Sequence, residues 1–187
     1  MIEKVIIAGA GGQGIMLLGK VLACGVMQEF KYVTWLPSYG AEVRGGAAYC
    51  MVVISDTEIG SPYINPADTL IIMNAPSLER FKNWVKFKGL LIVNSSLARC
   101  NIDKPRSLSA GRGKKNLQIL EYPFTDIAVK LGNIKVANMV ALGCYLANKK
   151  IIDLKNVFKV IEEIAPPDRK DLIEINKKAL REGMKLK

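Results

Sequence analysis

Three glycines near the start of the chain, Gly9, Gly11 and Gly14, have the G-x-G-x-x-G spacing that holds phosphate or carboxylate groups in other proteins. They follow the apolar run Lys4–Ala8, which predicts a strand buried on both faces, and precede a mostly apolar helix at Ile15–Glu29. The glycines permit a tight turn and close helix–strand packing, and the helix N-terminus offers free N–H groups to an anion. The alternative is a strand-to-helix turn that binds nothing.

The glycine spacing alone does not establish a dinucleotide site, because such a site also needs an acidic residue. That residue stands at the end of the second strand, about 20 residues past the loop, and holds the ribose hydroxyls. The second strand is predicted at Tyr32–Leu36, and the turn Pro37–Gly40 after it contains neither Asp nor Glu. Glu42 lies beyond this turn. The pattern therefore predicts the fold more strongly than it predicts NAD binding.

A second candidate loop, Pro37–Gly46, contains one proline and three glycines, which favour a shaped turn over continuous helix or strand. Glu42 and Arg44 are two residues apart, so in an extended segment their side chains point to the same side. There they pair with each other or with neighbours. Gly45 and Gly46 allow another backbone or a cofactor to come close. An internal Glu42–Arg44 pair that only holds the loop is the simpler interpretation of this spacing.

The chain contains no histidine, which excludes Ser-His-Asp and Cys-His catalysis and removes the usual proton shuttle near neutral pH. Its cysteines form no C-x-x-C pair, whereas iron–sulfur and zinc sites need clustered thiolates. They are Cys24, Cys50, Cys100 and Cys144. We expect them to be small core residues in a reducing compartment, and we expect no metal site in this chain. If the protein belongs to an enzyme, a cofactor or a partner chain supplies most of the chemistry.

The length of 187 residues suits a single domain over residues 1–187. No apolar run reaches the roughly 18 residues of a membrane span, and no signal-peptide pattern precedes the first predicted strand, so we expect a cytoplasmic protein without a membrane partner. The net charge is +10, which predicts a basic solvated surface or a docking surface for an acidic partner. Much of the basic excess lies between Arg99 and Lys115. No nucleic-acid partner is expected, because this stretch has no interleaved aromatic residues.

Strand-like runs that alternate with helical segments predict an α/β fold, with a mainly parallel sheet covered by helices on both faces. This is a Rossmann-like, three-layer arrangement with a helical C-terminal portion. The further expected strands are Ala47–Ser55, Thr69–Met73, Gly89–Asn94 and Leu117–Tyr122, and the further helices are Ser77–Val85, Thr125–Leu131, Lys135–Asn148, Leu154–Ile164 and Asp168–Glu182. Ligands bind beyond the carboxyl ends of such strands. That edge should collect Gly9–Gly14, Pro37–Gly46 and the polar triplet Asn94–Ser96.

Two motifs together, GAGGQG at residues 9–14 and PSYGAEVRGGAA at residues 37–48, resemble one known family. This is the gamma subunit, or gamma domain, of the 2-oxoacid:ferredoxin oxidoreductases, which include the pyruvate, 2-oxoglutarate and 2-ketoisovalerate enzymes. Further similar stretches are Ile59–Pro62, Pro66–Asp68, Val93–Ser96, Asn138–Gly143 and Asn176–Leu180. The resemblance covers almost the whole chain in order, and implies a single gamma-type domain.

The resemblance implies an oxidoreductase subunit that is inactive by itself. The family converts a 2-oxoacid, coenzyme A and oxidised ferredoxin to acyl-CoA, carbon dioxide and reduced ferredoxin, and here 2-oxoglutarate or a branched-chain oxoacid is slightly favoured as the substrate. Thiamine diphosphate is held chiefly by alpha and beta partners, and iron–sulfur clusters lie on other subunits or domains. This chain alone would therefore bind no cofactor. Its partners would be alpha, beta and, where present, delta subunits, with ferredoxin reached through the complex.

The resemblance also implies which loops face partner chains or the coenzyme A side of the active site, with no catalytic residue among them. They contain Gly9, Gly11, Gly12, Gln13, Gly14, Ser38, Tyr39, Gly40, Glu42, Arg44, Gly45, Gly46, Asn94 and Ser95. Three alternatives stay open. The first is an indolepyruvate oxidoreductase beta chain, which shares similar loops. The second is a stand-alone nucleotide- or CoA-binding α/β protein, and the third is a homo-oligomer, including a homodimer of the isolated chain.

Overall fold

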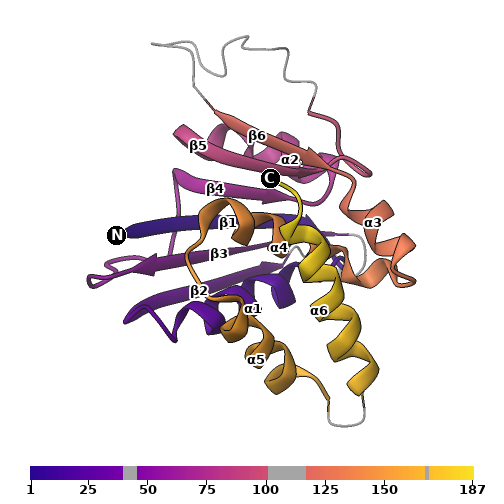
Figure 1. The fold of residues 1–187 in the computed structure, drawn as a ribbon. Helices are drawn as coiled ribbons and strands as arrows, with labels where there is room; N and C mark the ends of the chain where they lie inside the picture. The colour runs from indigo at the N-terminus through magenta and orange to yellow at the C-terminus, as the bar shows by residue number, and fades with distance from the viewer. Residues whose placement is uncertain (40–45, 101–116, 167–168) are drawn as a thin grey trace.

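A computed structural model describes residues 1–39, 46–100, 117–166 and 169–187, which form a sheet with helices on both faces (Figure 1). The strands are β1 (Ile2–Ala10), β2 (Tyr32–Tyr39), β3 (Ala47–Ser55), β4 (Ala67–Ile72), β5 (Val85–Asn94) and β6 (Gln118–Tyr122). The helices are α1 (Ile15–Val26), α2 (Ala75–Phe81), α3 (Phe124–Lys130), α4 (Ala137–Lys149), α5 (Leu154–Ile164) and α6 (Lys170–Met184), with 3₁₀ turns η1 (Lys82–Trp84) and η2 (Ile134–Val136). None of the described helices is long and apolar enough to cross a membrane.

The sheet has the strand order β2-β3-β1-β4-β5-β6. β4 pairs parallel with β1 and β5, and β6 pairs parallel with β5. β3 is antiparallel to both of its neighbours, β1 and β2, and is the one reversed strand among those described. The predicted α/β fold with a mainly parallel sheet is confirmed, although the reversed strand was not predicted.

Two cores cover the faces of the sheet, and β1 contributes to both because successive side chains of a strand point to opposite faces. Val5 and Ile7 lie in the larger core, together with residues of α1, α4 and α5. Ile6 and Ala8 lie in the smaller core, together with Leu78 of α2. Figure 1 shows α1, α4, α5 and α6 gathered on one face and α2 on the other. The three layers of the prediction are therefore present.

The second strand differs from the prediction. β2 continues through Pro37 and Ser38 to Tyr39, whereas the sequence predicted that the strand ends at Leu36 and that a turn follows. The physical reason is that β2 is an edge strand, and an edge strand tolerates a proline because no neighbour on its open side needs the missing N–H group. Residues 40–45 of the predicted loop lie outside the described residues.

Helices α4 and α6 cross in direct backbone contact. A Cβ atom on Gly143 of α4 would overlap the carbonyl oxygen of Leu180, and one on Gly183 of α6 would overlap the carbonyl oxygen of Val140. Beyond α6, the Tyr122 hydroxyl donates a hydrogen bond of 2.6 Å to the carbonyl oxygen of Lys187. These contacts fix α4, whose first turn lies against the glycine loop.

Candidate functional site

The loops after β1, β4 and β5 meet at the carboxyl-terminal edge of the sheet. The carbonyl oxygen of Met73, directly after β4, accepts a hydrogen bond from Nε2 of Gln13 and another from Nδ2 of Asn94, each at 3.3 Å. The structure therefore brings together the first and the third of the three loops that the sequence placed at this edge. Met73 links them, although no local pattern in the sequence marks this residue.

The first and last glycines of the pattern are required by packing. A Cβ atom on Gly9 would come within 2.5 Å of Oε1 of Gln13 and 2.7 Å of Cδ1 of Ile15. The carbonyl oxygen of Gly9 also accepts a hydrogen bond of 3.3 Å from the buried hydroxyl of Ser77 on α2. Gly14 has φ of 70°, the left-handed region that favours glycine, and serves as the N-cap of α1 without a side-chain hydrogen bond.

Asn138, at the start of α4, is a site residue that the sequence analysis did not identify. It is buried, and its Nδ2 donates a hydrogen bond of 3.1 Å to the carbonyl oxygen of Gly14. Its Oδ1 accepts 2.9 Å from the N–H of Met139. A Cβ atom on Gly14 would overlap the Asn138 amide. Asn138 in this position therefore requires glycine at residue 14. The available signal was its place at the start of one of the family-like stretches, Asn138–Gly143.

The middle of the glycine loop is the part that faces outward. Gly11 and Gly12 are exposed, and a Cβ atom on Gly12, which has φ of 92°, would meet nothing within 4 Å. The N–H of Gly11 donates 3.0 Å to the carbonyl oxygen of the buried Gly46, which ties this loop to the start of β3. Oε1 of Gln13 accepts 2.7 Å from the N–H of Ala10. These hydrogen bonds give the loop a fixed shape before any ligand or partner arrives.

Tyr39 lies at the rim of the same edge, with 70% of its side chain exposed. It lines a cavity of about 350 Å³ together with Gly11, Gly12 and Leu17. Ser38 is half-buried. The remaining predicted residues of this loop, which are Gly40, Glu42, Arg44 and Gly45, lie outside the described residues. The proposed Glu42–Arg44 pair therefore stays a prediction.

Asn94 does not face outward in this structure. It is fully buried, and its Nδ2 donates 2.9 Å to Oγ1 of Thr125 while its Oδ1 accepts 3.3 Å from the N–H of the same residue. It thus joins the end of β5 to the first turn of α3. Ser95 is half-buried, and its N–H donates 2.9 Å to the carbonyl oxygen of Tyr122. Asn94 therefore holds the edge together, and the partly exposed residues of the triplet are Ser95 and Ser96.

The strand order separates the glycine loop from the position that an NAD-binding acid would occupy. In the usual dinucleotide fold, the second strand lies directly beside the first. Here β3 lies between β1 and β2. Tyr39 at the end of β2 is therefore two strands away from β1, the strand that the glycine loop follows. Both the strand order and the lack of an acidic residue at the end of the second strand therefore argue against an NAD site.

The cysteines do not fit a metal or iron–sulfur site. Burial raises the pKa of Cys50 and of Cys144 from 9.0 to about 12, which keeps both thiols protonated, whereas metal ligation needs the thiolate. Cys24 and Cys100 are half-buried. Within the described ranges, no three His, Cys, Asp or Glu side chains lie close enough together to hold a metal ion.

Comparison with known proteins identifies the family. The model of the family "Pyruvate ferredoxin/flavodoxin oxidoreductase" matches residues 4–186. The chain belongs to this family. The 2-oxoglutarate synthase subunit KorC of Methanothermobacter marburgensis is 30% identical over 191 residues, covering 99% of this chain and 100% of KorC. The resemblance inferred from the two glycine-rich motifs is thereby confirmed.

Two further relatives differ in how much of their length the chain covers. The ketoisovalerate oxidoreductase subunit VorA of Methanothermobacter thermautotrophicus is 37% identical over 144 residues, which are 77% of this chain and 28% of VorA. The chain thus spans little more than a quarter of that relative. The solved gamma subunit of a keto/oxoacid ferredoxin oxidoreductase from Geobacter sulfurreducens is 25% identical, with a TM-score of 0.76 over 98% of this chain and 96% of that one.

Proposed function

We propose that this chain is the gamma subunit of a 2-oxoacid:ferredoxin oxidoreductase. The observation that carries the proposal is the end-to-end match with KorC, in which neither chain leaves a substantial segment unmatched. In the proposed reaction a 2-oxoacid and coenzyme A give acyl-CoA and carbon dioxide, and the two electrons released reduce ferredoxin. The likeness to KorC and VorA favours 2-oxoglutarate or a branched-chain 2-oxoacid as the substrate.

The residues of this chain support a role in assembly and positioning rather than in the chemical step. The chain has no histidine, and its two fully buried cysteines are held protonated. Thiamine diphosphate supplies the carbanion chemistry when bound, and we place it chiefly on the alpha and beta partners, with the iron–sulfur clusters on other subunits or domains. Four cysteines dispersed along the chain suit a reducing compartment, and we propose a cytoplasmic location.

We propose that the outward part of the glycine loop and the rim at Tyr39 face the partner chains or bound coenzyme A. Gly12 exposes its backbone, and Tyr39 presents an aromatic ring beside it over a shared cavity. The hydrogen bonds of Gly11 and Gln13 hold this surface in one shape, which lowers the cost of ordering it on binding. Arg44, from the adjoining loop, is proposed to take part in the same contact.

Reconstitution tests the proposal. The purified chain is assayed for coenzyme A-dependent reduction of ferredoxin with 2-oxoglutarate, 2-oxoisovalerate and pyruvate, alone and with purified alpha, beta and delta chains. We expect no turnover by the chain alone, and turnover when the partners are added. Turnover by the isolated chain, or a partner complex that is equally active without it, would refute the proposal. Substrate preference follows from comparing kcat/KM for the three oxoacids in the full complex.

A further inference from the structure

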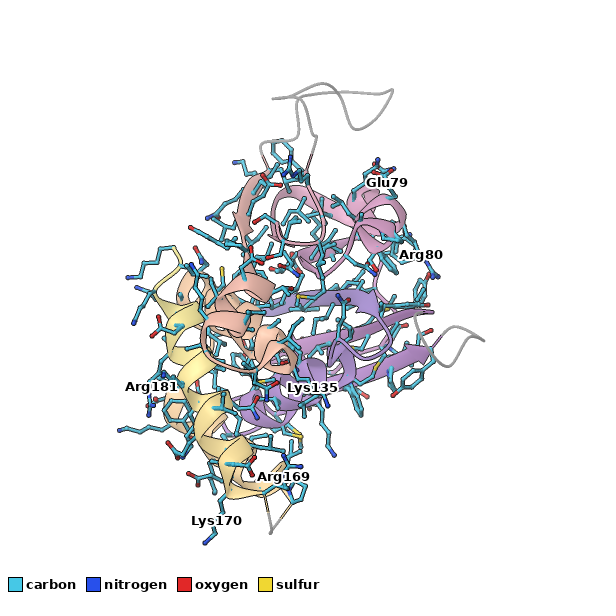
Figure 2. All side chains as sticks on the ribbon, turned by 90° about the vertical axis from the view of Figure 1, so that its right-hand side faces the viewer. Glu79, Arg80, Lys135, Arg169, Lys170 and Arg181 are labelled. Atoms are coloured by element: carbon cyan, nitrogen blue, oxygen red, sulfur yellow. The ribbon has the colours of Figure 1, made fainter. Side chains whose placement is uncertain are left out.

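A cavity of about 150 Å³ lies at the carboxyl-terminal edge of the sheet, and the glycine loop forms part of its wall. Its walls include the glycine loop with Gly12 and Gln13, the turn after β5 with Leu97, α3 with Thr125, and η2 with Ile134 and Lys135. Met73 after β4 and Ala137 of α4 complete the lining. Figure 2 looks onto this edge and shows Lys135 near its centre, well separated from the other labelled charges. The volume of this cavity is about that of an apolar cavity that holds one benzene molecule. A single side chain from another molecule would therefore fill it.

One residue that lines the cavity, Lys135, carries a positive charge that has no ion-pair partner among the described residues. Lys135 is the one charged residue among the described residues that line the cavity. Oγ1 of Thr125 already accepts a hydrogen bond of 2.9 Å from Asn94, so its own O–H group is left to donate. A cation and a hydroxyl donor on one small cavity favour a carboxylate that comes from outside the chain.

The surroundings of the cavity favour a protein segment over a small free anion. Leu97 is 47% exposed and Ile134 is 58% exposed, and both line the cavity and extend beyond it. A small carboxylate would neutralise Lys135 but leave these two apolar side chains in water, whereas a protein segment would cover them as well. The walls are also held in place, because Oδ1 of Asn133 accepts 3.0 Å from the N–H of Lys135.

The geometry points to a docking surface for a partner subunit, in which an acidic side chain of the partner enters the cavity and pairs with Lys135 while apolar neighbours cover Leu97 and Ile134. We call these three residues the Lys135 patch. The inference rests on the proposed function, because the occupant is a chain of the same oxidoreductase. It extends the partner contact beyond the residues that the sequence singled out, to Leu97 in the turn after β5 and to Ile134 and Lys135 of η2.

Binding of the purified alpha and beta chains to the immobilised chain tests the Lys135 patch, with Lys135→Glu and Ile134→Asp as the variants. The matched controls are Lys155→Glu, which makes the same charge change on α5 near the end of α1, and Ile2→Asp, which alters an isoleucine of 50% exposure at the opposite edge of the sheet. We expect each patch variant to weaken binding about tenfold or more and each control to leave it within about twofold. The wild-type affinity should also fall more steeply with salt than that of Lys135→Gln.

The outcomes separate the two proposals. If the wild-type chain binds its partners and the patch variants bind equally well, the Lys135 patch is wrong and the subunit assignment stands. If the wild-type chain binds neither partner, the proposed function fails and the docking surface fails with it. If excess acetate perturbs the NMR signals of Lys135 without weakening partner binding, the cavity is a small-anion site and the inference is overturned. Circular dichroism of each variant confirms that the fold is retained.

Discussion

The contact between Gly14 and Asn138 allows a sharp test of how the glycine loop is held. Gly14 caps α1 with φ of 70°, and Asn138 of α4 lies against it and donates a hydrogen bond to its carbonyl oxygen. The loop therefore depends on a pair of residues that are 124 positions apart in the chain. We propose the variants Gly14→Ala, Asn138→Ala and the double variant as a thermodynamic cycle.

The structure sets the size of each effect. Gly14→Ala forces a non-glycine residue into the left-handed region, at about 1–2 kcal/mol, and adds a steric overlap with the Asn138 amide, at about 1–3 kcal/mol. Asn138→Ala removes a hydrogen bond, about 1 kcal/mol, and leaves the carbonyl of Gly14 without its partner, about 1–3 kcal/mol. In the double variant the overlap is absent, because it needs both side chains. The double variant should therefore be less destabilised than the sum of the single variants, by about 1–3 kcal/mol.

Equilibrium urea unfolding followed by far-ultraviolet circular dichroism measures the four free energies. Gly60→Ala is the control, because a Cβ atom there meets nothing within 4 Å and its φ is not positive, so its effect should stay within about 0.5 kcal/mol. Additivity of the two single variants to within about 0.5 kcal/mol would refute the reasoning, since it would mean that Gly14 and Asn138 do not restrict each other.

Three further predictions concern the core. Gly183→Ala should lower the free energy of unfolding by about 3 kcal/mol, because its methyl group overlaps the backbone at Val140 and helix backbones cannot move as side chains do. The thiol of Cys144 should react with a disulfide reagent at pH 8 only on unfolding, and stability should fall as the pH rises from about 9 towards 12, because the unfolded thiol ionises first. Lys149→Met should cost about 2 kcal/mol, since it leaves the buried carboxylate of Glu3 without its cation.

Each of these three has a simple check. Thermal unfolding measures Gly183→Ala, and an unchanged Tm would show that α4 and α6 are not in backbone contact. Cys144→Ala should lose part of the decline in stability above pH 9, and an identical pH profile would contradict the assigned cause. For Lys149→Met, urea unfolding is compared with Lys155→Met on the exposed face of α5, and equal effects would show that the Glu3 pair contributes nothing.

The sequence predicted elements well where a local signal marks both ends. The strand at Ala47–Ser55 and the helix at Leu154–Ile164 have the predicted bounds. The strand is a long apolar run that is followed by a turn, and the helix begins after Asp153, whose carboxylate accepts a hydrogen bond of 3.0 Å from the N–H of Lys155. These signals lie within a few residues of the boundary that they determine.

The errors arose where the deciding fact is the position of a strand in the sheet. Pro37 ended the predicted second strand, because proline breaks a central strand, but β2 is at the edge. The antiparallel pairing of β2 and β3 is indicated in the sequence by the short connection between them. Only a short segment separates β2 from β3, and parallel neighbours need a crossover of a dozen or more residues, so the two strands had to pair antiparallel or not at all.

The candidate site was predictable in place but not in detail. The glycine spacing and the polar triplet after β5 located the carboxyl-terminal edge, because loops that follow parallel strands meet there. Asn138 carries no local pattern that points to Gly14, and its role depends on how α4 packs. Asn94 was singled out in the sequence because it is a polar residue at a strand end, where a partner could bind. In the structure it is fully buried and joins β5 to α3.

The hydrogen bonds of the edge explain why this chain suits a structural role in a larger enzyme. The N–H of Gly11 and the carbonyl oxygens of Gly14 and Met73 are all engaged within the chain, so these groups hold the loops to one another. Side chains that are exposed at this edge include the ring of Tyr39 at one cavity and, at another, Ile134 with Lys135. Such a surface binds a protein better than it performs chemistry. These observations are the basis on which we propose that the rigid edge is a platform for the assembly of partner chains.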